Sequence, residues 1–197
     1  MKETWNEKYN TGDYIFGKEP NEFFKEKIEN IAPGKVLFIA EGEGRNSVYA
    51  AKLGWKVDAI DFSSIGKEKA LVLASENKVK INYTLGDAIN YNYTANYYDL
   101  IVIINFHTDE NIRKSFHTKM IDSLKVGGKI ILQVFEKEQI KMDSGGPPNL
   151  DLLYSLEDII ESFIDFDFDY FDKNYALRNI NGKNKKAAVI RFFASKK

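Results

Sequence analysis

Two glycines, Gly42 and Gly44, lie one residue apart, directly after an apolar stretch at residues 36–40 and before a segment with helical spacing. Such a pair lets a backbone approach a ligand where any Cβ would collide, and the following helix presents unpaired N–H groups. A second strand-like stretch, residues 57–60, ends on Asp61. An acid about 20 positions after the glycines is placed to accept hydrogen bonds from ribose hydroxyls. This unit predicts a nucleoside-cofactor site.

The first two thirds of the chain alternate strand-like and helical segments. Residues 98–104 are apolar without a period of two, which predicts a strand buried on both faces of a parallel sheet sandwiched by helices. We expect the other strands of this part at residues 36–40, 57–60, 81–85 and 129–135. Apolar residues at helical spacing predict helices around residues 24–31, 48–51, 66–77 and 112–124. This order is typical of a doubly wound α/β sheet.

The last third has a different pattern. Residues 137–151 predict a long loop, and Ser155 begins a capping box that starts a helix. Residues 166–170 alternate aromatic and acidic side chains, which predicts a strand near an edge with one wet face. A final strand is expected at residues 188–194, after a polar turn at residues 181–184. Because no helix fits between these two strands, we expect an antiparallel pair.

Composition excludes several function classes. The 197 residues carry a net charge of −1, so we expect no nucleic-acid or membrane partner. No cysteine is present, and no apolar run is long enough for a signal peptide or a membrane span, which predicts a cytoplasmic protein. Asp165, Asp167 and Asp169 lack the glycine and the glutamate of a calcium loop, so no metal site is expected.

Two further details bear on the choice of nucleoside cofactor. The third glycine of the dinucleotide pattern falls at Ser47 and is missing. Gly86, Asp87 and Ala88 follow the strand at 81–85, at the carboxyl edge where an adenine can rest. Both details favour a cofactor other than a dinucleotide, although a nicotinamide-dependent oxidoreductase on the same sheet stays an alternative.

At these positions the sequence resembles the class I S-adenosylmethionine-dependent methyltransferases, above all the small bacterial branch that includes the tellurite-resistance and thiopurine methyltransferases. The likeness extends over nearly the whole chain. The segments that carry it are residues 14–21, Gly42-Glu43-Gly44-Arg45-Asn46, Ile60-Asp61-Phe62-Ser63, Gly86-Asp87, Leu124-Lys125-Val126-Gly127-Gly128 and Gly145-Gly146-Pro147.

The resemblance implies a three-layer, Rossmann-like sandwich with a seven-stranded sheet in the order 3-2-1-4-5-7-6, strand seven being antiparallel. It also implies one domain over residues 1–197, with a cap at 1–33, a cofactor-binding core at 34–135 and a substrate loop and strand pair at 136–197. The cofactor-binding residues that it implies are Ala40, Glu41, Gly42, Glu43, Gly44, Arg45, Asp61, Phe62, Ser63, Gly86, Asp87, Ala88 and Asn105.

The sequence departs from the family pattern at two positions. Phe38 stands where an acidic residue usually lies near the cofactor's amino group, and Glu41 replaces a small residue before the first glycine. Glu41 is therefore a candidate to supply the missing negative charge. Arg45 is a candidate to attract the cofactor's carboxylate.

His107 is the candidate catalytic residue, because it follows the strand at 98–104 on the edge where substrates bind, and its ordinary pKa suits proton transfer near neutrality. The alternative is that His107 only packs in its loop. We expect His117 at the surface, and Trp5, Tyr9, Tyr14 and Phe16 as either a lid or an anchor of the N-terminus.

The sequence thus predicts methyl transfer from S-adenosyl-L-methionine, with S-adenosyl-L-homocysteine as the product, to a small molecule such as a thiol or a chalcogen anion. A soft acceptor of this kind needs no strong base. The alternatives are the oxidoreductase above and a cofactor-binding protein without catalysis. We expect a monomer or a homodimer, since exposed edge strands permit association.

Overall fold

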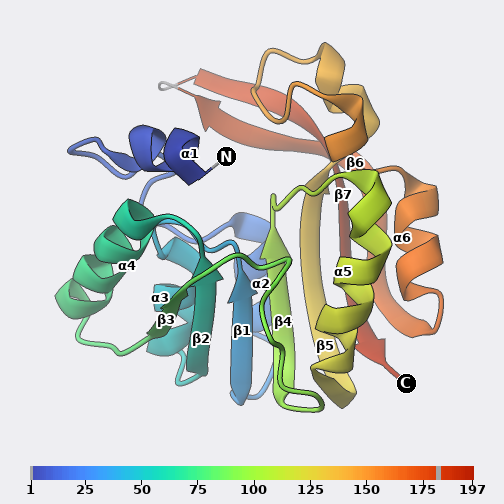
Figure 1. Cartoon of the computed structure of the whole chain (residues 1–197), viewed down its shortest axis with the longest axis horizontal. Coiled ribbons are helices and arrows are strands. Elements are labelled where there is room, and N and C mark those ends of the chain that lie inside the picture. The colour runs from blue at the N-terminus through green and yellow to red at the C-terminus, as the bar shows by residue number, and fades with distance from the viewer. Residues whose placement is uncertain (1, 181–182) are drawn as a thin grey trace.

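The computed structural model describes residues 2–180 and 183–197 and forms one mixed sheet with helices on both faces (Figure 1). The strands are β1 (Lys35–Ile39), β2 (Lys56–Asp61), β3 (Asn82–Leu85), β4 (Tyr98–Ile104), β5 (Leu124–Phe135), β6 (Phe166–Ile180) and β7 (Lys183–Lys196). The helices are α1 (Lys2–Tyr9), α2 (Glu22–Ile28), α3 (Arg45–Lys52), α4 (Ser64–Glu76), α5 (Glu110–Asp122) and α6 (Leu156–Phe163), with short 3-10 turns at Lys137–Lys141 and Leu150–Leu152.

The sheet has the order β3-β2-β1-β4-β5-β7-β6. The five strands from β3 to β5 are parallel, whereas β7 runs antiparallel to both β5 and β6. This confirms the predicted sheet, including its antiparallel strand. Because all the parallel strands end at one edge, the loops that follow β1, β2 and β4 meet there.

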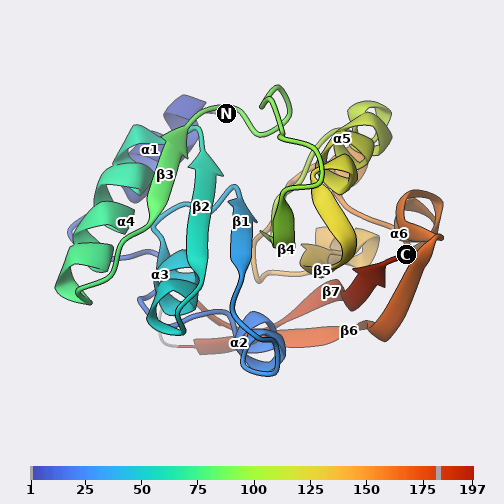
Figure 2. The same cartoon turned by 90° about the horizontal axis from the view of Figure 1, so that it is seen from below.

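Two apolar cores form because side chains alternate across each strand. Leu37 and Ile39 of β1 point to the face covered by α5 and α6, where Phe116 and Phe163 join the same core. The next residue, Phe38, points to the opposite face, which α2, α3 and α4 cover (Figure 2). The ring of Phe38 packs edge-on against Phe24 at 5.5 Å. Phe38 is therefore a core residue, which explains why no acid stands at this position.

The predicted helix starts are confirmed where a cap was identified. The side chain of Asn21 accepts a hydrogen bond from the backbone of Phe24, and Ser155 forms a capping box with Asp158. β4 has the predicted bounds, 98–104.

Several boundaries differ from the prediction, and β5 begins at Leu124 instead of residue 129. α5 ends at Asp122, because Leu124 already pairs with Tyr98 and a bulge follows before β5 becomes regular. Part of the predicted loop at 137–151 is a 3-10 helix. β6 and β7 are much longer than expected, because polar and apolar residues pair with one another along the whole hairpin. Residues 181–182 of the predicted turn lie outside the described part of the chain.

The length of this hairpin matters for the site. Its far end projects beyond the carboxyl edge of the sheet and extends toward α1 (Figure 1). The hairpin and α1 therefore face each other across the strand ends.

A substitution at Gly44 tests how closely α4 packs against the glycine turn. This glycine has a φ of 89°, and a Cβ there would lie 2.6 Å from the Cβ of Ala70. We expect Gly44→Ala to lower the free energy of unfolding by about 2–5 kcal/mol, from an unfavourable backbone and overpacking together. Urea denaturation measures this loss.

Gly127→Ala is the matched control, because Gly127 has a φ of 74° but nothing lies within 4 Å of its ideal Cβ. It should lose only the backbone part, about 1–2 kcal/mol. Equal losses in the two variants would contradict close packing of α4 against the turn.

Candidate functional site

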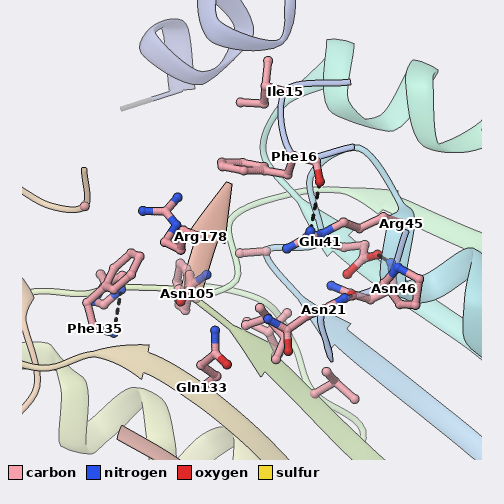
Figure 3. A pocket seen from close by; sticks show the side chains of 18 of the residues that line it. Ile15, Phe16, Asn21, Glu41, Arg45, Asn46, Asn105, Gln133, Phe135 and Arg178 are labelled. Carbon is pink, nitrogen blue, oxygen red and sulfur yellow. Dashed lines mark hydrogen bonds between the residues drawn. The ribbon is translucent and has the colours of Figure 1, made fainter. Parts of the chain in front are cut away.

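A cavity of about 1030 Å³ opens at the carboxyl edge of the sheet. Three parts of the chain line it: the N-terminal segment from α1 to α2, the ends of β1, β2, β4 and β5, and the hairpin with the loop at residues 146–148. Figure 3 shows polar and charged side chains from all three parts converging on this space. The cavity is large for a single small ligand, since typical pockets hold about 300–1,000 Å³.

Asp61 lies at the tip of β2 and joins two loops. Its Oδ2 accepts a hydrogen bond from the backbone of Gly42 at 3.0 Å, and its Oδ1 accepts one from Ser63 at 2.8 Å. The side chain is buried yet lines the cavity. Burial raises the pKa of this carboxyl, and the backbone donors oppose the shift. A carboxylate has about four lone-pair positions, so Asp61 can still accept from a ligand.

Glu41 occupies the N-terminus of α3. Its Oε1 accepts hydrogen bonds from the backbone of Asn46 at 3.0 Å and of Ser47 at 2.7 Å, so a side chain already satisfies the free amides of this helix. Burial raises the pKa of Glu41 to about 7, although these hydrogen bonds and Arg45 lower it. Glu41 is therefore a helix cap that also borders the cavity.

Arg45 starts α3 and faces the same space (Figure 3). Its Nη1 donates to the backbone oxygen of Phe16 at 2.9 Å. Burial lowers the pKa of this guanidinium, and Glu41 opposes the shift. No acidic side chain of the described residues forms an ion pair with it.

The aromatic residues of the N-terminal segment form one wall of the cavity. Trp5 stacks at a tilt on Tyr9, with ring centroids 5.3 Å apart, and also contacts Phe16. A Cβ on Gly42 would lie 2.4 Å from the hydroxyl of Tyr9, so Gly42 is needed for this helix to approach. These contacts place the aromatic group over the glycine turn.

Glu43 connects the aromatic wall of the cavity to the rest of the protein. The side chain of Glu43 is buried, accepts a hydrogen bond from the backbone of Ile15 at 2.9 Å and forms an ion pair with Lys69 of α4. Asn6 of α1 accepts a further hydrogen bond from the hydroxyl of Ser63 at 2.7 Å. Glu43 and Ser63 therefore act behind the cavity wall and do not line the cavity itself.

His107 and Asn105 follow β4 and line the cavity. The His107 Nδ1 lies 2.9 Å from the backbone oxygen of Leu152, and the backbone of Phe135 donates to Nε2 at 3.4 Å. Burial lowers the pKa of His107 to about 4. Asn105 has a φ of 58°, and its buried Oδ1 has no hydrogen-bond partner among the described residues.

The segment after β3 lies apart from the cavity. Asp87 is exposed and accepts hydrogen bonds from the backbone of Ile89 and the side chain of Asn90. Gly86 and Ala88 are not among the lining residues either. Of the predicted cofactor residues, those that line the cavity are Ala40, Glu41, Arg45, Asp61, Phe62 and Asn105.

Several lining residues were absent from the sequence-based set. Gln133 at the end of β5 is buried, and Arg178 comes from the unexpected extension of β6. The register of the long hairpin brings Arg178 over the strand ends, and no local motif marks it. His117, expected at the surface, is instead buried at 1% exposure between Ser162 and the hydroxyl of Tyr154, so that prediction was wrong. Its burial lowers its pKa to about 3.

Residues 36–128, from β1 to the start of β5, match the methyltransferase domain family. The structure is similar to TehB from Haemophilus influenzae, with a TM-score of 0.77 and 22% identity over 100% of this chain and 67% of that one. It is also similar to an S-adenosylmethionine-dependent methyltransferase from Clostridium acetobutylicum, with a TM-score of 0.69 and 15% identity over 100% and 92% of the two chains. No curated protein matches the sequence.

A third similar structure is that of a protein studied for the conversion of a disulfide bond into a thioacetal group during echinomycin biosynthesis. It has a TM-score of 0.75 and 16% identity, over 100% of this chain and 93% of that one. The domain match covers residues 36–128, and the similar structures show that the whole chain shares the Rossmann-like methyltransferase fold that the sequence predicts. No helix among the described residues is long and apolar enough to cross a membrane.

The raised pKa of Glu41 predicts a pH dependence of stability. Between its ordinary pKa of 4.5 and about 7, the folded protein binds more protons at this site than the unfolded chain. Stability therefore falls as the pH rises through this window. Relative to Glu41→Gln, the wild-type protein should lose about 2–3 kcal/mol between pH 4.5 and 7.5.

Urea denaturation of both proteins at each pH measures this difference, and the variant cancels the contribution of Asp61, which both proteins share. A difference that stays constant with pH would show that Glu41 keeps its ordinary pKa in the folded protein, and one that grows in favour of the wild-type protein as the pH rises would show a lowered pKa. Either result would contradict the prediction.

Proposed function

We propose that this protein transfers a methyl group from S-adenosylmethionine to a small-molecule acceptor, and that the cavity between α1 and the hairpin holds both molecules. The single observation that carries the proposal is the arrangement at the glycine turn. Asp61 projects into the cavity with free lone pairs, while the amides of α3 are already bound by Glu41.

The residues present suit this cofactor. Asp61 has acceptor positions for two ribose hydroxyls, and Phe62 lies beside it for the adenine. The unpartnered, buried Oδ1 of Asn105 calls for a donor such as an amino group. Glu41 and Arg45 offer opposite charges to the ammonium and the carboxylate of the methionine part.

The arrangement at α3 also argues against a dinucleotide. A pyrophosphate would bind at the free amides of this helix N-terminus. Here Glu41 accepts from two of those amides, so they are not free to bind a phosphate. The missing glycine at Ser47 also argues against a dinucleotide, because the third glycine of that pattern allows close packing of the helix on the strand.

The cofactor supplies a methyl group on a positively charged sulfur, which is electrophilic without further activation. The protein's part is to align the acceptor and to exclude water. Trp5 and Tyr9 cover the glycine turn, and Glu43 with Lys69 fixes the segment that carries them. Glu41 and Asp61 would attract the positively charged cofactor as it binds, whereas the rate of transfer depends on alignment and on the exclusion of water.

His107 is a weak candidate for a general base. Its pKa of about 4 means that the imidazole holds a proton poorly at neutral pH, and its Nδ1 is engaged with Leu152. An acceptor that loses its proton readily, such as a thiol, reaches the site as an anion without help. We therefore propose that His107 orders the loop after β4 and that catalysis needs no base.

Calorimetry with S-adenosylhomocysteine and with NAD tests the cofactor. We expect S-adenosylhomocysteine to bind and NAD to bind at least about a hundredfold more weakly, because Glu41 closes the α3 amides to a pyrophosphate. Glu41→Gln should weaken S-adenosylhomocysteine about tenfold through the lost attraction to its ammonium.

An assay of S-adenosylhomocysteine release over thiols, selenite, tellurite and small acids then tests the transfer itself. Tight cofactor binding without release on any acceptor would favour a binding protein that lacks catalysis. Preferred binding of NAD would instead support the oxidoreductase alternative.

His107→Gln separates the two roles of the histidine. We expect S-adenosylhomocysteine release with a thiol acceptor to stay within about threefold of the wild-type rate, because a glutamine can still donate to Leu152. A general base contributes about 10²–10⁴-fold, so a loss of that size with unchanged cofactor affinity would show that His107 accepts the proton.

A further inference from the structure

Arg178 is a cation that lines the cavity and has no role in the proposed binding of the cofactor. It lies on β6, in the part of the hairpin that extends over the strand ends, and its side chain points into the cavity (Figure 3). Its Nη1 donates to the backbone oxygen of Ser144 at 2.6 Å, and the guanidinium lies 4.9 Å from the ring centroid of Phe135. Both contacts fix its direction without neutralising it.

Of the other cations that line the cavity, Arg191 and Lys18 have anionic partners, Arg45 has an assigned ligand, and Lys8 is exposed and lies over the ring of Trp5 at 4.5 Å. Arg191 is bound by Asp172 at 2.6 Å and Lys18 by Glu76 at 2.7 Å. Arg45 faces the proposed position of the methionine carboxylate. No carboxylate of the described residues lies within ion-pair distance of Arg178.

The environment of Arg178 makes this lone charge costly. Burial lowers the pKa of its guanidinium, and the charge of Arg45 adds to the shift. A partly buried cation that no acid compensates is stabilised by an anion from outside, and an arginine binds a planar carboxylate through two parallel hydrogen bonds.

Apolar side chains form part of the cavity that Arg178 faces. Phe135 lies against its guanidinium, and Phe106, Pro147, Pro148 and Leu152 also line the cavity. Among the described strand ends, the uncharged side-chain amides that line it are those of Asn105 and Gln133. A small inorganic oxyanion would leave this apolar surface uncovered, whereas an organic molecule would bury it.

We propose that the methyl acceptor is an organic carboxylate with an apolar body, held by a carboxylate–guanidinium contact with Arg178 while its body packs on Phe135 and the loop at 147–148. This inference rests on the proposed function. The carboxylate is the handle, and a separate nucleophilic atom of the acceptor takes the methyl group. A bond forms from that atom to the methyl carbon as the sulfur–methyl bond breaks, and its electron pair remains on the sulfur of neutral S-adenosylhomocysteine. Any proton on the nucleophile goes to solvent.

Calorimetry on the protein saturated with S-adenosylhomocysteine tests the handle without knowledge of the true acceptor. The probes are benzoate, phenylacetate and 3-phenylpropionate, each with its own primary amide, and selenite as a small oxyanion. We expect at least one acid to bind about tenfold or more tightly than its amide, since a hydrogen bond to a charged group exceeds one to a neutral group.

Arg178→Gln should reduce the preference for the acid to less than about threefold, while Arg178→Lys retains part of it. Lys186→Gln is the matched control. Lys186 pairs in register with Leu177, the neighbour of Arg178, and it is exposed and outside the cavity, so its loss should leave the preference intact.

Three outcomes would overturn the inference: no preference for any acid in the wild-type protein, an unchanged preference in Arg178→Gln, or binding of selenite alone. S-adenosylhomocysteine affinity is measured first in every variant. If the wild-type protein fails to bind it, the proposed function fails. If the protein binds it but shows no preference for any acid, only the acceptor class is wrong.

Discussion

The site depends on one carboxylate that joins two loops. Asp61 accepts hydrogen bonds from Gly42 and Ser63 at once, so the turn after β1 and the turn after β2 cannot move independently. The glycine turn is closed from the other side by Tyr9 and Ala70, which leave no space for a Cβ on Gly42 or Gly44. This arrangement holds the proposed nucleoside site in one geometry before any ligand binds, which is the basis of pre-organised binding.

The chemistry of the cavity follows from where its charges stand. Glu41 neutralises the N-terminus of α3, which in dinucleotide-binding proteins attracts phosphate, and thus leaves a negatively charged floor. A cofactor with a positive sulfur suits that floor. At the opposite wall, Arg178 offers a positive charge. Glu41 and Asp61 thus line the cavity together with Arg45 at the ends of the strands, whereas Arg178 comes from the hairpin.

Most elements could be predicted, because local signals specify them: the unbroken apolar run at 98–104, the caps at Asn21 and Ser155, and the glycine turn. The sheet order was implied by the resemblance to the methyltransferase family and not by these signals. The register of pairing between β6 and β7 could not be predicted from local signals. The long β6–β7 hairpin depends on cross-strand pairing between distant residues, so neither its length nor the position of Arg178 follows from periodicity. The burial of His117 likewise depends on contacts with Tyr154 and Ser162 that only the fold brings together.

A crystal structure of the protein with S-adenosylhomocysteine tests the central claim most directly. We expect both ribose hydroxyls to donate to Asp61 while its bonds to Gly42 and Ser63 persist, with the ammonium near Glu41 and the carboxylate near Arg45. A nucleoside bound away from Asp61, or a cavity that holds only solvent at saturating ligand, would contradict it.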